Sequence, residues 1–272
     1  MDLTSYSYEK VSEHIYRILD ALDVAAYLIV GEKEAYLLDT CFGFGDVKAF
    51  VESVTPLPLT VVLTHGHCDH ICGVGHFDHA YMNRKDLPVF EEHSDPVFRR
   101  DSLIGIHGLE LDLSEFYTFS ADMLEDLPDD RTIDLGGVTM QLLQAPGHTP
   151  GSLCALVEED RVLIIGDVCD DNVLLFEDTS SNVSGYMNAL QRIKDMEPMY
   201  DRVLGNHGVY EFQKEIIDNV LECCHKILAH EDEHIPTNML GHDLFSAAVI
   251  GEDMLRLDGK QGNVLYREDK AN

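Results

Sequence analysis

The chain has 272 residues, of which 45% are hydrophobic and 25% charged, which is the composition of an ordinary globular protein. Its 50 acidic residues against 19 basic ones give a formal net charge of −31. Because such a surface repels phosphate backbones and anionic lipids, the charge argues against nucleic-acid and membrane partners.

The first 65 residues alternate between short apolar runs and turns. Runs rich in Tyr, Ile, Leu and Val predict β-strands at residues 13–19, 25–30 and 34–40. Residues 46–54 predict a helix, because Val47, Phe50, Val51 and Val54 fall on one face. The run "LTVVLTH" then predicts a buried strand that ends at His65, with a short helix near residues 71–77.

The chain is less regular between residues 85 and 130, where polar residues and three prolines predict broken helix and loop. We interpret the stretch around residues 87–130 as a lid insertion. Beyond it, strands are predicted within residues 137–148, 153–167 (two strands), 201–208 and 262–269, and helices within 186–196 and 210–228.

Strands followed by helix occur twice along the chain, which indicates two similar α/β halves. Sheet packed on sheet, with helices outside, predicts an α/β (α+β) fold of the four-layer αββα sandwich type. We expect a single domain over residues 1–272, with a C-terminal helical extension around residues 210–272.

Four predicted strand-to-loop junctions carry histidine or aspartate. The first is "THGHCDH" at residues 64–70, which contains His65, His67, Asp69 and His70. The later three hold one such residue each: His148 in "APGHTPGS", Asp167 in "IIGD" and His207 in "GNHG". Ligand-binding groups of α/β folds collect at strand ends, so all seven side chains could meet at one edge.

Neutral imidazole nitrogen and carboxylate oxygen are ligands that zinc and similar divalent ions accept. His65 and His67 are two residues apart, so both could face one ion, while Asp69 and His70 could face a second. The sequence therefore predicts two adjacent divalent metal ions, with Zn²⁺ favoured and Mn²⁺ or Fe as alternatives.

The ordered motifs "THGHCDH", "GHTPGS", "GD" and a late Gly-flanked histidine resemble the metallo-β-lactamase superfamily. The resemblance spans the chain from "LLDT" near residue 40 to His207 and implies the αββα sandwich of that family. It implies that His65, His67 and His148 bind the first metal. Asp69, His70 and His207 would bind the second, and Asp167 would bridge both. Asp39 resembles an early aspartate of the family that supports the ligands without being one.

The resemblance and the metal chemistry together favour a binuclear hydrolase. A hydroxide that bridges the two metals would attack a small ester, thioester or lactone, and Asp69 or Asp167 would take the proton. The alternative is an iron-dependent oxidoreductase of the flavodiiron or sulfur-dioxygenase type. His67 argues against the flavodiiron branch, which usually has a glutamate ligand there. A third hypothesis, a non-enzymatic binding module, is disfavoured because every ligand position is intact.

For partners we expect a small-molecule substrate, no nucleic acid, no membrane and possibly a homo-oligomer. The start of the chain has no secretory pattern, and no apolar run is long enough for a membrane helix. The seven irregularly spaced cysteines are interpreted as reduced thiols, so a cytoplasmic location is expected.

Overall fold

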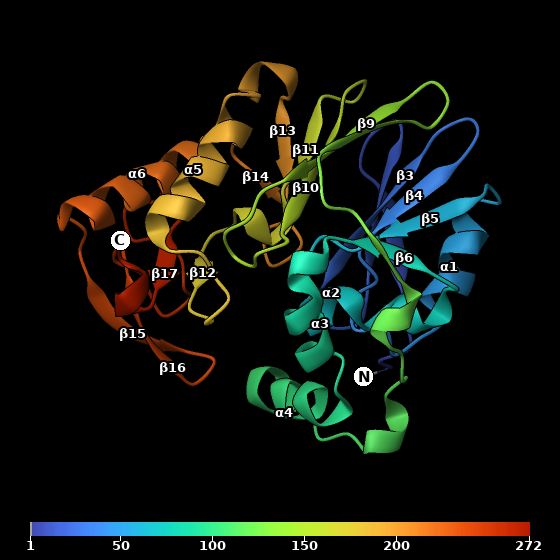
Figure 1. Ribbon diagram of the computed structural model, residues 1–272, viewed down its shortest axis with the longest axis horizontal. Helices are drawn as coiled ribbons and strands as arrows, with labels where there is room; N and C mark the ends of the chain where they lie inside the picture. The colour runs from blue at the N-terminus through green and yellow to red at the C-terminus, as the bar shows by residue number, and fades with distance from the viewer. Residues whose placement is uncertain (1) are drawn as a thin grey trace. The chain divides into compact units, whose positions relative to one another are not determined.

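The computed structural model describes residues 2–272. The chain divides into two compact units between Gln141 and Leu142. We call them the N-terminal unit and the C-terminal unit, and each is described by itself. The colour of Figure 1 follows the chain, so the N-terminal unit runs from blue into green and the C-terminal unit ends in red.

A seven-stranded sheet forms the centre of the N-terminal unit, with its strands in sequence order. The strands are β1 (Ser7–Lys10), β2 (Ile15–Leu19), β3 (Ala25–Val30), β4 (Ala35–Leu38), β5 (Leu59–Val62), β6 (Ala80–Met82) and β7 (Leu124–Asp126). Pairing is antiparallel from β1 to β4 and parallel from β4 to β7. The predicted strands at 13–19, 25–30, 34–40 and 59–65 are confirmed as β2 to β5.

Four α-helices belong to this unit: α1 (Val47–Val54), α2 (Cys68–Ile71), α3 (Leu87–His93) and α4 (Pro96–His107). The side chain of Asp46 accepts the N–H of Ala49 and so caps the start of α1. α1 buries Val47 and Val51 and is the crossover that parallel pairing of β4 with β5 requires. The predicted helix near 71–77 begins earlier, as α2, and continues as a 3₁₀ turn over Cys72–His76.

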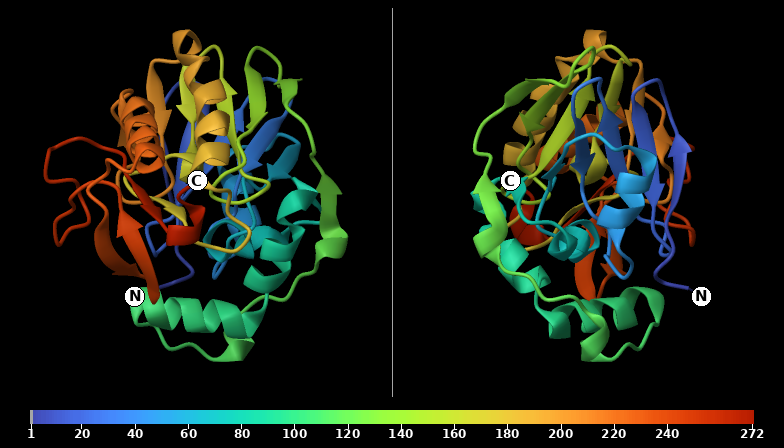
Figure 2. Two further views of the ribbon diagram at one scale, coloured as in Figure 1. Left: turned by 60° about the vertical axis from the view of Figure 1, so that its left-hand side comes forward. Right: turned by 90° about the vertical axis from the view of Figure 1, so that its right-hand side faces the viewer.

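The segment interpreted as a lid, residues 87–130, is more regular than its sequence indicates. It contains α3, α4 and β7, and α3 and α4 lie next to each other in the views of Figure 2. Arg99 on α4 is buried, donates to the carbonyl of Tyr117 at 2.6 Å and lies 4.9 Å from the ring centre of Phe116. These contacts attach α4 to the chain that follows it. A lid function stays a prediction.

The N-terminal unit ends in a hairpin of β8 (Arg131–Asp134) and β9 (Thr139–Gln144), and the division falls within β9. From the second half of β9, the C-terminal unit continues its sheet in the order β9-β10-β11-β13-β14. These strands are β10 (Leu153–Val157), β11 (Val162–Ile164), β13 (Arg202–Leu204) and β14 (Glu211–Phe212). β11 and β13 are parallel because α5 (Val183–Lys194) lies between them in sequence.

The helices α5 and α6 (Ile216–Ala229) pack side by side in the C-terminal unit, as Figure 1 shows. Their apolar faces join the strands in one core, to which Leu163, Tyr186 and Ile217 contribute fully buried side chains. These elements confirm the strands predicted within 153–167 and 201–208 and the helices predicted within 186–196 and 210–228.

The expected helical extension over residues 210–272 needs correction, because α6 is its only α-helix in the described structure. Most of the remainder is a small sheet in the order β12-β17-β16-β15. Its strands are β12 (Val173–Leu175), β15 (Ile235–Met239), β16 (His242–Ser246) and β17 (Val264–Tyr266). The final predicted strand is β17, whereas β15 and β16 were missed because prolines, charges and exposed residues interrupt their apolar pattern. Over residues 2–272, no helix combines the length and apolarity needed to cross a membrane.

Candidate metal centre

The first group of predicted ligands lies in the N-terminal unit, and we call it the N-terminal ligand cluster: His65, His67, Asp69 and His70. It follows β5, where the chain turns into α2 at the carboxyl end of a parallel strand. The three histidines are buried. Nε2 of His65 lies 3.1 Å from Nδ1 of His67, and the ring centres of His65 and His70 are 4.1 Å apart. The short spacing of the motif therefore does bring these side chains together.

The tautomer of His65 follows from a chain of hydrogen bonds. The hydroxyl of Thr64 donates its single proton to Asp39 Oδ2 at 2.8 Å, because an ionised carboxylate can only accept. The hydroxyl oxygen of Thr64 also lies 3.1 Å from Nδ1 of His65 and, with its own proton used, accepts a hydrogen bond from that nitrogen. The lone pair of His65 therefore resides on Nε2, the atom that faces His67.

Asp39 fixes His70 in the same way. Its Oδ2 accepts a hydrogen bond from Nδ1 of His70 at 2.8 Å. In the neutral imidazole this leaves the lone pair of His70 on Nε2. That nitrogen lies 3.7 Å from a carboxylate oxygen of Asp69. Asp39 itself is 1% exposed and its other oxygen accepts the N–H of Thr64 at 2.7 Å. Its predicted supporting position beside the ligands is thus confirmed geometrically.

We expect Asp39→Asn to weaken zinc binding by about 10–100-fold, the usual cost of losing a partner that orients a metal-binding histidine. An asparagine amide can still accept one proton but no longer supplies the charge that holds both Thr64 and His70. Isothermal titration of the metal-free variant with zinc measures the loss. Unchanged affinity would show that the orientation of His70 does not depend on Asp39.

Close backbone packing explains why glycine stands between the first two histidines. A Cβ on Gly66 would lie 2.8 Å from the backbone nitrogen of Phe90 in α3. Cys68, next in the motif, is buried, and burial raises the pKa of its thiol well above the usual range. A protonated thiol in this position is a packing group.

The second group lies in the C-terminal unit, and we call it the C-terminal ligand cluster: His148, Asp167 and His207. Nδ1 of His148 donates to the carbonyl of Leu174 at 2.9 Å, so its lone pair resides on Nε2. That Nε2 lies 3.7 Å from Oδ2 of Asp167, whose Oδ1 lies 3.5 Å from Nε2 of His207. Asp167 thus lies between two imidazoles, one toward each carboxylate oxygen.

A third acidic residue lies close to this cluster and was not singled out from the sequence. Burial and the negative charge of Asp167 raise the pKa of Asp170 to about 7, although the charge of His207 opposes the shift. Asp171, its neighbour, also has a raised pKa because of burial. The run "GDVCDD" was the available signal, since three carboxylates in five positions repel one another unless protons or cations are present.

We predict that metal-free protein loses stability as pH rises from 5 to 8 and that Asp170→Asn reduces this loss. The pKa of Asp170 is raised in the folded state, so its contribution is present below its ordinary pKa and is lost as pH rises through about 7. A difference of about 1–3 kcal/mol between pH 5 and pH 8 is expected from urea unfolding. Glu252→Gln, at an exposed acid, serves as control; equal slopes for Asp170→Asn and wild type would contradict the prediction.

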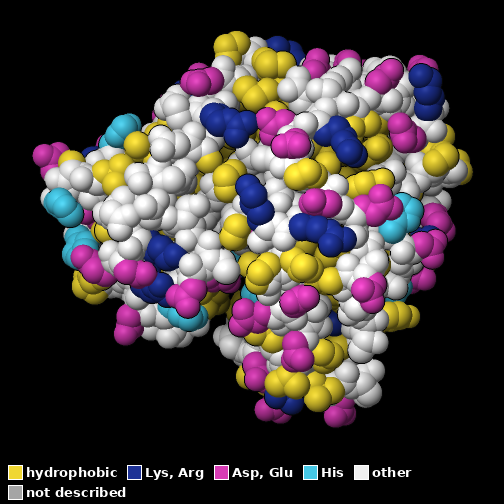
Figure 3. Space-filling model, viewed as in Figure 1, with side chains coloured by type: hydrophobic (Ala, Val, Ile, Leu, Met, Phe, Trp, Pro, Cys, Tyr) yellow, Lys and Arg dark blue, Asp and Glu magenta, His cyan; other side chains and the backbone are white. Residues whose placement is uncertain are grey.

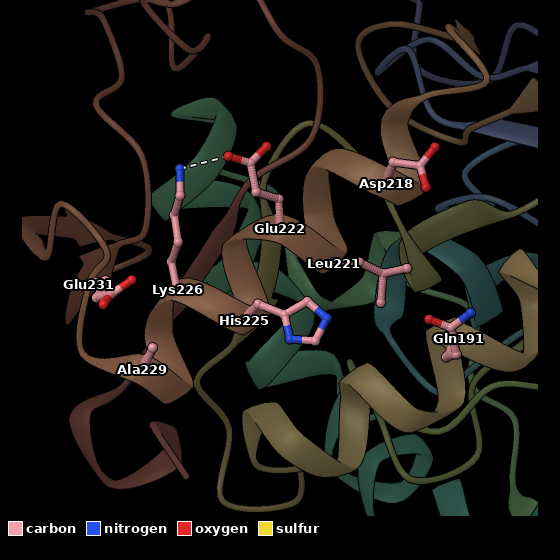
Figure 4. Close-up of a pocket in the computed structure, with 8 residues that line it drawn as sticks. All are labelled: Gln191, Asp218, Leu221, Glu222, His225, Lys226, Ala229 and Glu231. Atoms are coloured by element: carbon pink, nitrogen blue, oxygen red, sulfur yellow. Dashed lines mark ion pairs between the residues drawn. The ribbon is translucent and has the colours of Figure 1, made fainter.

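A hollow of about 670 Å³ also lies in the C-terminal unit, along α5 and α6 (Figure 4). Its lining comprises Gln191, Asp218, Leu221, Glu222, His225, Lys226, Ala229 and Glu231. Glu222 accepts hydrogen bonds from Lys226 and Lys260, and these bonds lower the pKa of Glu222 to about 2. The hollow contains none of the predicted ligands, so it is separate from the candidate metal centre.

A family model described as the metallo-beta-lactamase superfamily matches residues 19–200, more than half of the chain. The chain belongs to the metallo-β-lactamase superfamily. A solved metallo-β-lactamase from Pontibacter korlensis matches with a TM-score of 0.61 at 14% identity, over 81% of this chain and 99% of that one. The chain therefore has the metallo-β-lactamase fold, a mixed α/β fold with several sheets, and the predicted fold class is confirmed.

Three curated members of the superfamily are similar in sequence. A beta-lactamase-like protein 2 homolog from Caenorhabditis elegans is 24% identical over 82% of this chain and 68% of its own length. The acyl-coenzyme A thioesterase MBLAC2 of Gallus gallus is 23% identical over 66% of this chain and 71% of its own. The probable polyketide biosynthesis zinc-dependent hydrolase PksB of Bacillus subtilis is 24% identical over 65% and 68%.

Family, fold and donor chemistry together identify this member of the metallo-β-lactamase superfamily as a metal-dependent hydrolase. In each unit, histidine and aspartate atoms of the kind that bind zinc lie within a few ångströms of one another. Supporting residues that were not singled out from the sequence are Thr64, His93 and Asp170.

Proposed function

We propose that this chain hydrolyses a small carboxylic ester, thioester or lactone at two divalent metal ions. The observation that carries the proposal is the tautomer of three histidines. The second ring nitrogen of His65, His70 and His148 is fixed by Thr64, Asp39 and the carbonyl of Leu174, respectively. Each lone pair is thereby held on Nε2, as metal-binding histidines require.

The arrangement of the donor atoms is electrostatically more favourable with bound cations than without them. In both units a histidine nitrogen that carries a lone pair faces a carboxylate oxygen: His70 faces Asp69, and His148 faces Asp167. Two electron-rich atoms at 3.7 Å repel each other unless a proton or a metal cation lies between them. A chain with net charge −31 has no shortage of acids, but these two carboxylates each lie beside a histidine ring nitrogen.

We propose that the two clusters act together. One metal would be held by His65, His67 and His148, and the other by Asp69, His70 and His207, with Asp167 shared between them. This assignment rests on the ordered motifs of the superfamily, whose model spans six of the seven positions. When bound, such ions lower the pKa of coordinated water and polarise a carbonyl oxygen.

Residues of the chain supply the other parts of the reaction. Asp69 or Asp167 would take the proton released when water adds to the substrate carbonyl. Asp39 keeps His70 in one tautomer throughout, since its second oxygen is occupied by Thr64. Cys68 is not a nucleophile, because burial raises the pKa of its thiol and disfavours the thiolate.

The substrate class is supported by the charge and by the named relatives. One relative is named an acyl-coenzyme A thioesterase and another a probable zinc-dependent hydrolase, so hydrolysis recurs among similar chains and one of them is named for thioesters. Acidic side chains are spread over the face drawn in Figure 3, which disfavours a polyanion as large as RNA. We therefore rank thioesters and esters above phosphodiesters.

A substrate panel with defined zinc content tests the proposal. Short acyl thioesters, aryl esters, lactones, a bis-aryl phosphodiester and a β-lactam are supplied to protein that holds two zinc ions. We expect turnover of the carbonyl substrates and none of the phosphodiester. Preferential phosphodiester hydrolysis would overturn the substrate class, and activity that requires iron would favour the oxidoreductase alternative.

A further inference from the structure

The helix α3 contacts the N-terminal ligand cluster at both of its ends. At its start, Oδ2 of the fully buried Asp86 accepts the N–H of Gly66 at 2.9 Å. At its end, Nδ1 of His93 accepts the N–H of Cys68 at 3.2 Å. The backbone on either side of His67 is therefore attached to one helix that lies about twenty residues further along the chain.

The need for an outside acceptor follows from the residue that starts α2. Helices are usually capped by a serine, threonine, aspartate or asparagine whose side chain accepts N–H groups of the first turn. Here the capping position is His67, and its side chain makes no capping hydrogen bond. Even a usual cap would accept the N–H of the second or third residue, so the N–H of Cys68, the first residue of α2, must find its acceptor outside the helix.

His93 also contacts the ring of His67 directly. The two rings stack with centres 4.6 Å apart and planes 26° apart, and the ring centres of His93 and Phe98 are 4.2 Å apart. His93 is itself buried, so its own orientation is restrained. One residue thus fixes both the backbone after His67 and the plane of its imidazole.

We propose that His93 is a positioning residue of the metal centre, which accepts the first N–H of α2 from outside that helix. The inference rests on the proposed function, because it assumes that His67 is a ligand. By accepting the N–H of Cys68, His93 fixes the start of the helix that carries Asp69 and His70. Neither the family motif nor the sequence pattern assigns it this role.

Two substitutions separate the hydrogen bond from the stacked ring. His93→Phe keeps an aromatic ring against His67 and removes the acceptor, whereas His93→Asn keeps an acceptor at the position of Nδ1 and removes the ring. We expect His93→Phe to weaken zinc binding about 10–100-fold and His93→Asn to restore most of it. His79→Phe, at an exposed histidine of the same unit, is the matched control.

Zinc affinity is measured by competition with a chromophoric chelator, and cobalt substitution gives an absorption spectrum that reports ligand geometry. A shifted cobalt spectrum in His93→Phe, but not in His93→Asn, is the expected signature. If both variants bind zinc as wild type does, or if only the Asn variant is impaired, the proposal is overturned. Wild-type protein that binds fewer than two zinc ions would instead defeat the proposed function.

A second background keeps the test decisive if His93→Phe folds poorly. Cys68→Pro removes the N–H instead of its acceptor, and proline is well tolerated at the first position of a helix. The preceding His67 has φ −73° and ψ 149°, which a following proline allows. In this background, exchanging His93 for Phe should change zinc affinity less than threefold. An undiminished effect would show that His93 acts by another route.

Discussion

Asp167→Asn is expected to lower hydrolysis of an accepted ester or thioester by at least about a hundredfold, more than the loss of a supporting residue costs. Asp167 has one carboxylate oxygen toward His148 and the other toward His207, so it is the proposed residue shared by both metals. An amide is neutral and offers only one acceptor atom, so we expect at most one zinc ion per chain. Turnover assays and elemental analysis of the same samples measure both effects.

The matched control is Asp178→Asn. Asp178 is an exposed aspartate of the same unit that pairs with Arg267 on the surface. Its replacement should leave zinc content and turnover within about twofold of wild type, since exposed ion pairs contribute little. If Asp167→Asn retained two zinc ions and full turnover, Asp167 would not be a ligand.

The second large effect that we predict is the loss of turnover and of stability when the metal is removed. Seven candidate ligands from both units would lose their cations, so turnover should fall to background and return when zinc is added. Zinc at about a hundred times its dissociation constant stabilises the folded state by roughly 2.7 kcal/mol. For a chain of this size we expect the melting temperature to rise by about 5–10 °C.

Calorimetry of metal-free and zinc-loaded protein measures this shift, with magnesium as the control ion because it prefers oxygen ligands. A melting temperature that does not change when zinc is added would contradict the metal-dependent mechanism. Turnover that is retained after complete removal of the metal would contradict it too. An equal response to magnesium would indicate a site made of carboxylates and not of histidines.

Much of the fold was predictable because the apolar runs are short and well separated. β3 coincides with the predicted strand at residues 25–30, and its side chains are almost all buried. The N-terminal ligand cluster was predictable for a different reason, because three histidines and an aspartate within seven residues need no knowledge of tertiary structure. Local pattern was sufficient in both cases.

Apart from Asp39, which the family resemblance indicated, the support of the site was not predictable, because it depends on contacts between distant parts of the chain. His93 lies 25 residues beyond Cys68 and resembles any helical histidine in sequence. Asp170 was not singled out from the sequence, and burial beside Asp167 raises its pKa in the folded chain. The strands β15 and β16 were missed because exposed residues mask their alternation.

Diffraction from zinc-loaded crystals at the zinc absorption edge tests the central claim most directly, because it locates each ion without reference to activity. We predict two anomalous peaks per chain. The first should be bound by His65, His67 and His148, the second by Asp69, His70 and His207, with Asp167 contacting both. A single peak, or zinc held by residues of one unit alone, would contradict the proposal that the two clusters form one binuclear centre.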